Sequence, residues 1–217
     1  GMKIDAMLND FPQIKANHTT KIMVHDAAAN MTNGARVHSG SVYENLVCID
    51  HLLNTSLKHA ETKTPEIKEL FTKCKALAQR LHQSTSDAKR LQKACQTLKV
   101  DSLKIIQPCV TRWNSNYMML YSIHAMKKAL QHVKFDKDTK DELAVLIPYA
   151  IEFDIIEYMK DILEVFKKMS EKWSSDKRPT LQLILEDMVN LESFVDRRIN
   201  RYRDYEDGQI AKFLKNL

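Results

Sequence analysis

The sequence predicts an α+β protein that is predominantly α-helical and carries a small parallel β component. Glycine and proline are scarce, at 4 and 5 of 217 residues, which disfavours all-β folds with many tight turns. Apolar residues recur at three- and four-residue intervals over most of the chain after His51. Two short runs of β-branched and long apolar residues precede that pattern and are typical of buried strands.

The two predicted strands are short and parallel. The first covers residues 21–25 and is followed directly by Asp26, and the second runs from Leu46 to Ile49. Residues 30–39 between them are long enough for a short crossover helix, so the pair could form a βαβ unit.

The rest of the chain is predicted to be helical. The strongest amphipathic pattern starts with a Thr-Pro pair and predicts a helix over residues 65–81. Further helices are expected at the following positions: 87–98 with Ser86 or Asp87 as cap, 117–133, 143–170 with a kink at Pro148, and 181–202. A polar link at 134–138 divides the expected domains, 1–133 and 134–217.

Charge is unevenly distributed along the chain. Residues 58–104 contain eleven Lys or Arg and five Asp or Glu, a net charge of about +6. Residues 138–196 contain seven and fourteen respectively, a net charge of about −7. Four arginines at residues 197–203 could be a solvated helix end or a phosphate-contacting patch. The whole chain is only mildly basic, at +5, so total charge alone does not indicate a nucleic-acid partner.

The four cysteines show no paired spacing, and no apolar run is long enough to cross a membrane. Reduced thiols in an intracellular compartment are therefore expected.

Arg112 and Trp113 stand at the start of a predicted helix, between polar residues. Taken alone, this stretch is a capped helix entrance, with Trp113 packed on the first turn and Arg112 solvated. A Trp beside a fixed positive charge is also suited to stacking on a base next to a phosphate. Local sequence leaves both interpretations open.

Three motifs in order resemble the catalytic domain of hAT-superfamily DNA transposases, including the BED-type zinc-finger proteins derived from them. They are Asp-Ala-Ala-Ala-Asn-Met at residues 26–31, Cys-Ile-Asp-His-Leu-Leu-Asn at 48–54 and Thr-Arg-Trp-Asn-Ser-Asn-Tyr-Met-Met-Leu at 111–120. The resemblance extends from Lys3 to about Val133, and the ordered set is more specific than any one motif.

The resemblance implies a truncated RNase H-like core with a helical insertion, in a nuclear protein that acts on DNA and not on a small-molecule substrate. In that family, an Asp, Asp, Glu triad holds Mg²⁺ or Mn²⁺ for DNA cleavage and strand transfer. Asp26 matches the second acid and would be both catalytic and metal-binding. The first Asp and the Glu have no counterpart here, so this fragment is expected to be inactive and to bind no metal. Ala27 replaces the usual Asn.

The resemblance also assigns DNA contacts to Arg112, Trp113 and His51. Cys48 and His51 form a poor zinc site, because Cys-x-x-His lacks a second pair of ligands. The structural alternative is that His51 caps a helix and Cys48 packs in the core. The leading hypothesis is a piece of a transposase or of a protein derived from one, and the alternative is a non-enzymatic DNA- or protein-binding module. A helical scaffold with no nucleic-acid role is a third interpretation. The edge of the first strand would be exposed or paired with another copy, so a homo-oligomer is also considered.

Overall fold

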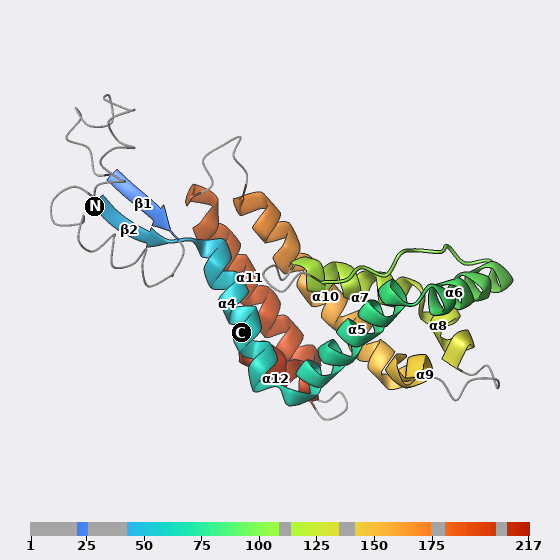
Figure 1. The fold of residues 1–217 in the computed structure, drawn as a ribbon. Helices are drawn as coiled ribbons and strands as arrows, with labels where there is room; N and C mark the ends of the chain where they lie inside the picture. Colours follow the sequence, from blue (N-terminus) through green and yellow to red (C-terminus); the bar gives the residue numbers. More distant parts are fainter. Residues whose placement is uncertain (1–20, 26–42, 109–113, 135–141, 175–180, 203–207) are drawn as a thin grey trace, which may run out of the picture. The chain divides into compact units, whose positions relative to one another are not determined.

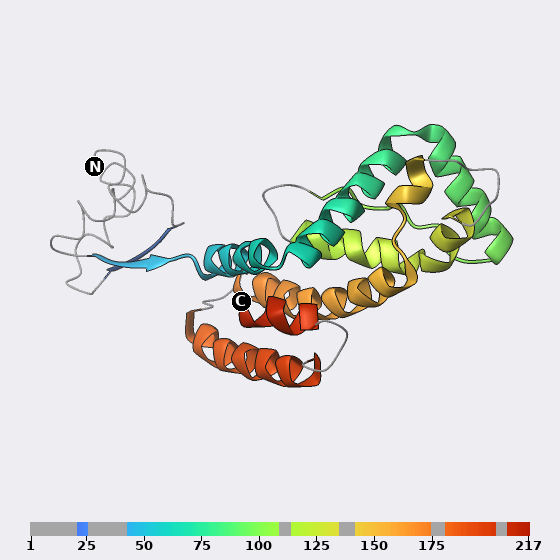
Figure 2. The same ribbon diagram turned by 90° about the horizontal axis from the view of Figure 1, so that it is seen from below.

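The computed structural model describes residues 21–25, 43–108, 114–134, 142–174, 181–202 and 208–217 (Figures 1 and 2). The chain divides into two compact units, residues 1–55 and residues 56–217. Within the described residues, no helix is long and apolar enough to span a membrane.

The first unit contains a two-stranded parallel sheet. Strand β1, Lys21–His25, pairs with β2, Tyr43–Val47, in a register that sets Lys21 opposite Tyr43 and His25 opposite Val47. The first strand lies where the sequence predicts it, whereas the second begins and ends earlier than predicted. Ile49 is already the first residue of helix α4, Ile49–Lys63, which crosses the boundary between the units. The expected crossover helix at 30–39 lies outside the described residues.

The predicted fold class, an α+β protein with a truncated RNase H-like core, is wrong. The sheet has only the two strands β1 and β2 in the described residues, and the second unit is built from helices alone there. Two short strands cannot bury a core of their own. The apolar residues that form the core instead recur at helical spacing, so the described architecture is that of a helical domain.

Helices α5, Pro65–Gln83, and α6, Thr85–Leu98, form a hairpin. The buried residues of α5 share one face of the helix and are Ile67, Leu70, Phe71, Cys74, Leu77 and Ala78. Burial raises the pKa of the Cys74 thiol to about 12, which keeps it neutral. The cap of α6 is Ser84, whose hydroxyl oxygen accepts from the backbone N–H of Asp87, and not Ser86 or Asp87 as predicted.

The next three helices are shorter than the sequence suggests. They are α7, Asn114–Ala125, α8, Lys127–Lys134, and α9, Glu142–Leu146. Pro148 ends α9 and separates it from α10, Ala150–Trp173, where the sequence predicts a kink in one helix. The backbone N–H of Tyr149 donates to the Glu152 carboxylate at 2.6 Å and so closes the start of α10.

Helix α10 occupies the centre of the second unit. It packs along α7, and its other contacts include α11, Leu181–Tyr202, and α12, Gln209–Lys215 (Figure 2). The boundary expected at residue 133 therefore falls inside this unit, because α7 from one predicted domain packs on α10 from the other. Helix α12 has no counterpart in the sequence prediction.

A buried polar group joins α10 to α11. Asp187 accepts hydrogen bonds from Trp173 Nε1 at 2.8 Å and from Lys172 Nζ at 2.7 Å. Burial raises the pKa of the Asp187 carboxyl, but the two hydrogen bonds outweigh it, so the pKa lies below its usual range. The second tryptophan of the chain is thus buried and satisfied through its only donor.

Replacing Asp187 by Ala should lower the free energy of unfolding by about 1–3 kcal/mol, since it leaves the buried Trp173 N–H without an acceptor. Urea unfolding followed by tryptophan fluorescence measures this loss. The matched control is Glu186→Ala, because Glu186 is the exposed neighbour on the same helix and should change stability by about 0.5 kcal/mol or less.

Wild type and Asp187→Ala together also test the role of the Asp187 charge. A carboxyl whose folded pKa is depressed stabilises the fold above its unfolded pKa, near 3.8, and loses that contribution as pH falls below it. The difference between wild type and Asp187→Ala should therefore shrink as pH is lowered through 3.8. Equal stability of the two proteins at pH 7 would contradict this role.

Candidate nucleic-acid interface

The site residues predicted from sequence are only partly within the described structure. Asp26, Arg112 and Trp113 lie outside the described residues, so the structure does not test whether they come together. His51 lies in the first turn of α4, half-buried, and its backbone carbonyl accepts from the Thr55 hydroxyl at 2.9 Å. Cys48 precedes that helix, and its carbonyl accepts the N–H of Leu52.

No cluster of metal ligands and no disulfide occurs in the described part of the chain. Its residues include no group of three or more His, Cys, Asp or Glu that could hold a metal ion. Cys48, Cys74 and Cys95 are free thiols.

The basic segment of the sequence divides into paired and unpaired cations. Lys73 binds Glu152 at 2.6 Å, and Lys75 lies 3.4 Å from Glu61. Arg80 binds both Asp87 and Glu142. Acidic residues therefore neutralise several of the positive charges that the sequence places between residues 58 and 104.

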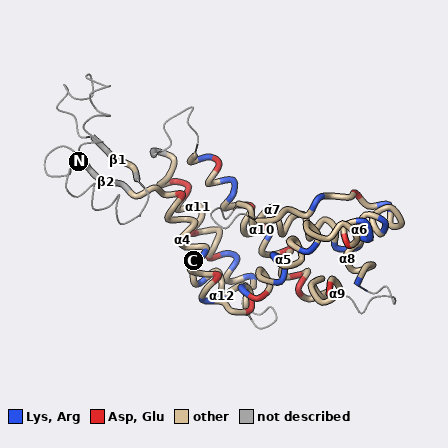
Figure 3. The backbone as a smooth tube through the Cα atoms, in the orientation of Figure 1, with Lys and Arg blue, Asp and Glu red and all other residues tan. Residues whose placement is uncertain are grey.

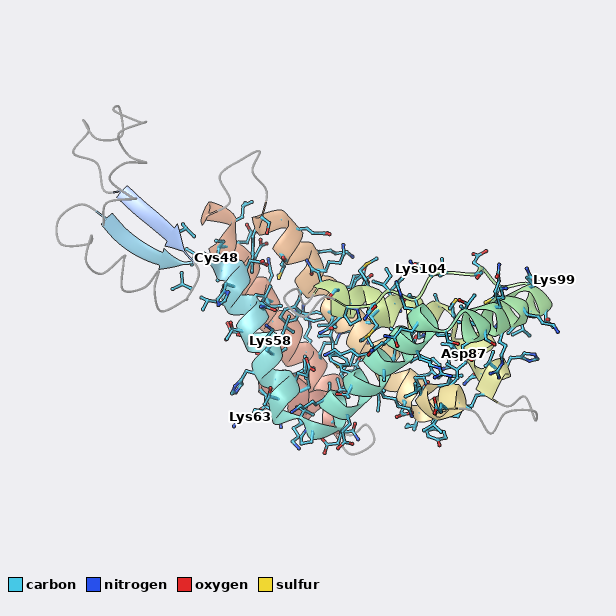
Figure 4. The ribbon with its side chains drawn as sticks, in the orientation of Figure 1. Cys48, Lys58, Lys63, Asp87, Lys99 and Lys104 are labelled. Carbon is cyan, nitrogen blue, oxygen red and sulfur yellow. The ribbon has the colours of Figure 1, made fainter. Side chains whose placement is uncertain are left out.

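Four lysines at the α6 end of the second unit, here called the α6 lysine group, are exposed and take part in none of the ion pairs of the described residues: Lys89, Lys93, Lys99 and Lys104. Figure 3 shows Lys and Arg gathered along α6. Figure 4 places Lys99 at the far end of α6 and Lys104 on the extended segment that runs back from it. The exposed carboxylate of Asp101 lies between these two lysines in sequence.

Lys58 and Lys63 belong to α4 and not to this group (Figure 4). The intervening helix α5 has 19 residues and is therefore about 28 Å long. Lys58 and Lys63 therefore stand on a different helix from the α6 lysine group, with α5 between them in the chain.

Two contacts fix the lysines on the fold. Asp87 is buried where α5 meets α6, and its carboxylate binds Arg80 Nε at 2.7 Å and Arg90 Nη1 at 3.5 Å. Burial raises the pKa of the Asp87 carboxyl, yet the hydrogen bonds from Arg80 and Ser84 and the charges of both arginines hold it below its usual range. This charged cluster joins the start of α6 to the end of α5.

The extended segment after α6 is held by Ser122 of α7. The Ser122 hydroxyl accepts the backbone N–H of Ile106 at 3.2 Å and donates to the Met119 carbonyl at 2.9 Å. The side chain of Ile105 is buried beside this bond. The backbone that carries Lys104 is therefore attached to the helical core.

Lys99 has an unusual backbone conformation. Its φ of 51° and ψ of 40° lie in the left-handed region, at the position after α6 that glycine usually occupies. Its N–H bonds to the carbonyls of Cys95 and Gln96 and closes the helix. The left-handed conformation costs a residue with a Cβ about 1–2 kcal/mol, so glycine at this position would relieve strain.

The arginines at the end of α11 are partly engaged in local contacts. Arg198 donates to the Tyr202 hydroxyl at 3.0 Å and lies over the rings of Phe194 and Tyr202. Arg197 and Arg201 are exposed. The α6 lysine group supplies four exposed cations without ion pairs in the described residues, against two exposed arginines at the end of α11, and is therefore the better candidate for contact with phosphates. Sequence reasoning placed it in a basic region but did not single out its members, although Lys89 and Lys93 stand at the four-residue spacing of one helix face.

Residues 46–145 match the family described as the ZBED1 RNase-like helical domain. This family is transposase-derived and related to hAT transposases, so the chain is related to such proteins over a segment that includes the α6 lysine group. The relation expected from the sequence motifs is confirmed at this level, but the match is to the helical domain and not to a catalytic domain. No curated protein matches the chain.

Replacing Lys99 by Gly should increase the free energy of unfolding by about 0.5–1 kcal/mol. Relief of about 1–2 kcal/mol of strain exceeds the entropic cost of glycine, about 0.5–1 kcal/mol. Urea unfolding measures the change. The same replacement at Lys93, in the interior of α6, should cost about 1 kcal/mol. A Lys99→Gly protein that is less stable than wild type would show that the lysine itself supports the fold.

Proposed function

We propose that this transposase-derived chain binds DNA through the α6 lysine group of its helical unit and reads the phosphate backbone, not the base sequence. The observation that carries the proposal is the set of four exposed lysines without ion-pair partners, while neighbouring cations are neutralised by acids of the same unit. A cation that has no internal partner can exchange its counterions for a phosphate. The proposal includes a nuclear location, where such a protein meets DNA.

Two features support DNA over an ordinary solvated surface. Asp87, the acid nearest to these lysines on α6, is buried and bound by two arginines, so it contributes little negative potential outside. The strained Lys99 keeps an ammonium group at the far end of α6 at the expense of stability. Lysines without a planar fork suit backbone contact and not base recognition.

We expect Lys89→Gln, Lys93→Gln, Lys99→Gln and Lys104→Gln, combined in one protein, to weaken duplex binding at least tenfold. The slope of log affinity against log salt should fall in magnitude by about 0.9 for each phosphate that the variant no longer neutralises. Fluorescence anisotropy with a labelled duplex at several NaCl concentrations measures both quantities.

The matched control replaces Lys58 and Lys63 by Gln, because both are exposed lysines of the same chain on another helix. Its salt slope should stay closer to that of wild type. Lys99→Gly adds a second control, since weaker binding by a more stable protein cannot result from unfolding. A quadruple variant that binds like wild type would contradict the proposal and favour a helical scaffold without a nucleic-acid role.

A second candidate function, metal-dependent DNA cleavage through Asp26, is favoured by the parallel strand pair. The register sets His25 opposite Val47, so both strands end at the same edge, and Asp26 is the residue that follows β1 in sequence. Ligands of parallel sheets bind outside this edge. The described residues do not fit a metal site by themselves, because they contain no group of three ligands. The candidate therefore needs further carboxylates, as the resemblance to hAT transposases implies.

For this candidate, Asp26→Ala in the complete protein that carries this chain should abolish nicking of terminal-repeat DNA in Mg²⁺ or Mn²⁺, because the acid is required as a metal ligand. Gel analysis of nicked plasmid measures the activity. Asp101→Ala, which removes an exposed acid from the helical unit, is the control. Nicking that survives Asp26→Ala would show that Asp26 is not a ligand of the catalytic metal. A wild-type protein that never nicks DNA would contradict this second candidate function and leave DNA binding as the proposed function.

A further inference from the structure

The end of α6 and the first residues after it, here called the α6 tip, are residues 98–104. Leu98 is 38% exposed and Leu103 is 39% exposed. Each leucine is followed directly by an exposed lysine, Lys99 and Lys104, and these two lysines mark the tip in Figure 4. A single exposed leucine is common in proteins. Two leucines that each precede an exposed lysine offer an apolar and a cationic contact at the same place.

The backbone of the α6 tip is held in position. The N–H of Val100 donates to the Cys95 carbonyl at 3.0 Å, and Ser102 forms a side-chain hydrogen bond with Cys95. Leu98 lies three residues beyond Cys95 on α6, about 4.5 Å along the helix, and Leu103 follows Ser102 directly. Both leucines therefore flank a fixed turn. A fixed turn loses little conformational entropy when it binds a partner, which favours affinity.

The α6 tip lies within a strongly basic part of the sequence. Residues 88–134 contain nine Lys or Arg and one Asp or Glu, a net charge of +8. The one acid is Asp101, in the tip itself, where two lysines outnumber it. The only acid of α6 is Asp87, which is buried and bound by arginines. This charge is complementary to a polyanion and repels basic partners.

The packing of α6 decides which groove of a duplex the tip can enter. A helix with its side chains is about 10–12 Å wide, and the major groove of DNA is about 12 Å wide. Because α6 packs on both α5 and α8, it cannot lie in the major groove as a free helix. A leucine side chain at its tip can enter the narrower minor groove, where apolar side chains of DNA-bending proteins separate neighbouring base pairs.

We propose that Leu98 and Leu103 enter the minor groove of a DNA duplex, separate neighbouring base pairs and bend the duplex. Lys99 and Lys104 hold the phosphates beside the opened step. This inference rests on the proposed function, DNA binding by the α6 lysine group, and adds the class of DNA that is preferred. Leucine forms no hydrogen bonds with bases, so the preference follows from how easily a base step opens and not from its sequence code.

The experiment compares two double variants. The tip variant carries Leu98→Ala and Leu103→Ala and keeps every lysine. The control carries Leu185→Ala and Val189→Ala, which remove two apolar side chains of α11 that are 79% and 62% exposed. Circular dichroism confirms the fold of each protein. Fluorescence anisotropy measures affinity for an intact duplex and for the same duplex with one mismatched pair, and energy transfer between dyes at the two duplex ends measures bending.

Wild type and the control should bind the mismatched duplex about tenfold more tightly than the intact one, because less energy is needed to open a mismatched step. Both proteins should also bring the ends of the intact duplex closer together. The tip variant should bind the two duplexes with equal affinity and leave the intact duplex straight. Its slope of log affinity against log salt should match that of wild type, because the lysines remain.

Three results would overturn the inference and leave the proposed function standing. Wild type could bind DNA with no preference for the mismatch and no bending, which would restrict the contact to phosphates. The tip variant could bend DNA as wild type does, which would exclude the two leucines. Wild type could bind vesicles of phosphatidylserine and phosphatidylcholine through these leucines without bending DNA, which would assign the tip to a lipid surface. Failure of wild type to bind any duplex would instead contradict the proposed function and this inference together.

Discussion

Burial of the apolar side of α10 is the constraint on which the helical unit depends. Its fully buried residues include Phe153, Ile156, Met159 and Ile162, which follow one another at three-residue steps. Each such side chain contributes about 1.5–3 kcal/mol when it is removed from water. The apolar surface of α10 is shared among three helices, because α7, α11 and α12 all pack on it. The positions of α7, α11 and α12 therefore follow from one central helix.

Charge pairing explains why only part of the basic sequence is available to a partner. The acids of α10 bind cations of earlier helices, with Glu152 on Lys73 and Asp154 on Lys127 at 3.2 Å. These pairs are partly exposed and each adds little stability. Their larger effect is on the surface potential, because each neutralises one cation, Lys73 on α5 and Lys127 on α8, whereas the lysines of α6 make no ion pair in the described residues. Acids from the acidic part of the sequence thus pair with some cations of earlier helices, and the unpaired lysines at the α6 end stay positively charged.

Sequence reasoning succeeded where one strong local pattern decides the structure. The helix expected at 65–81 occurs as Pro65–Gln83, and the last stripe occurs as Leu181–Tyr202. The break at Pro148 was underestimated, because the apolar period continues across it while the missing N–H and the ring of proline end α9. Helix α12 is only seven residues long and is stabilised by contacts from distant helices, so no local signal marks it.

The predicted fold class is wrong because motifs of a catalytic domain were extended to a chain whose described core is helical. The site could be predicted only in part, since Asp26, Arg112 and Trp113 lie outside the described residues and the role of Lys99 depends on a backbone angle.

The contact between α12 and α5 has a consequence for synthesis of the chain. Phe213 and Leu214 are buried at the end of the sequence, α12 packs on α5, and Lys212 lies 3.8 Å from Glu66, so partners are separated by well over one hundred residues. Closing so long a loop cannot happen before α12 leaves the ribosome. Until then the apolar faces of α5 and α10 remain incompletely covered, which exposes the nascent chain to chaperones and to aggregation.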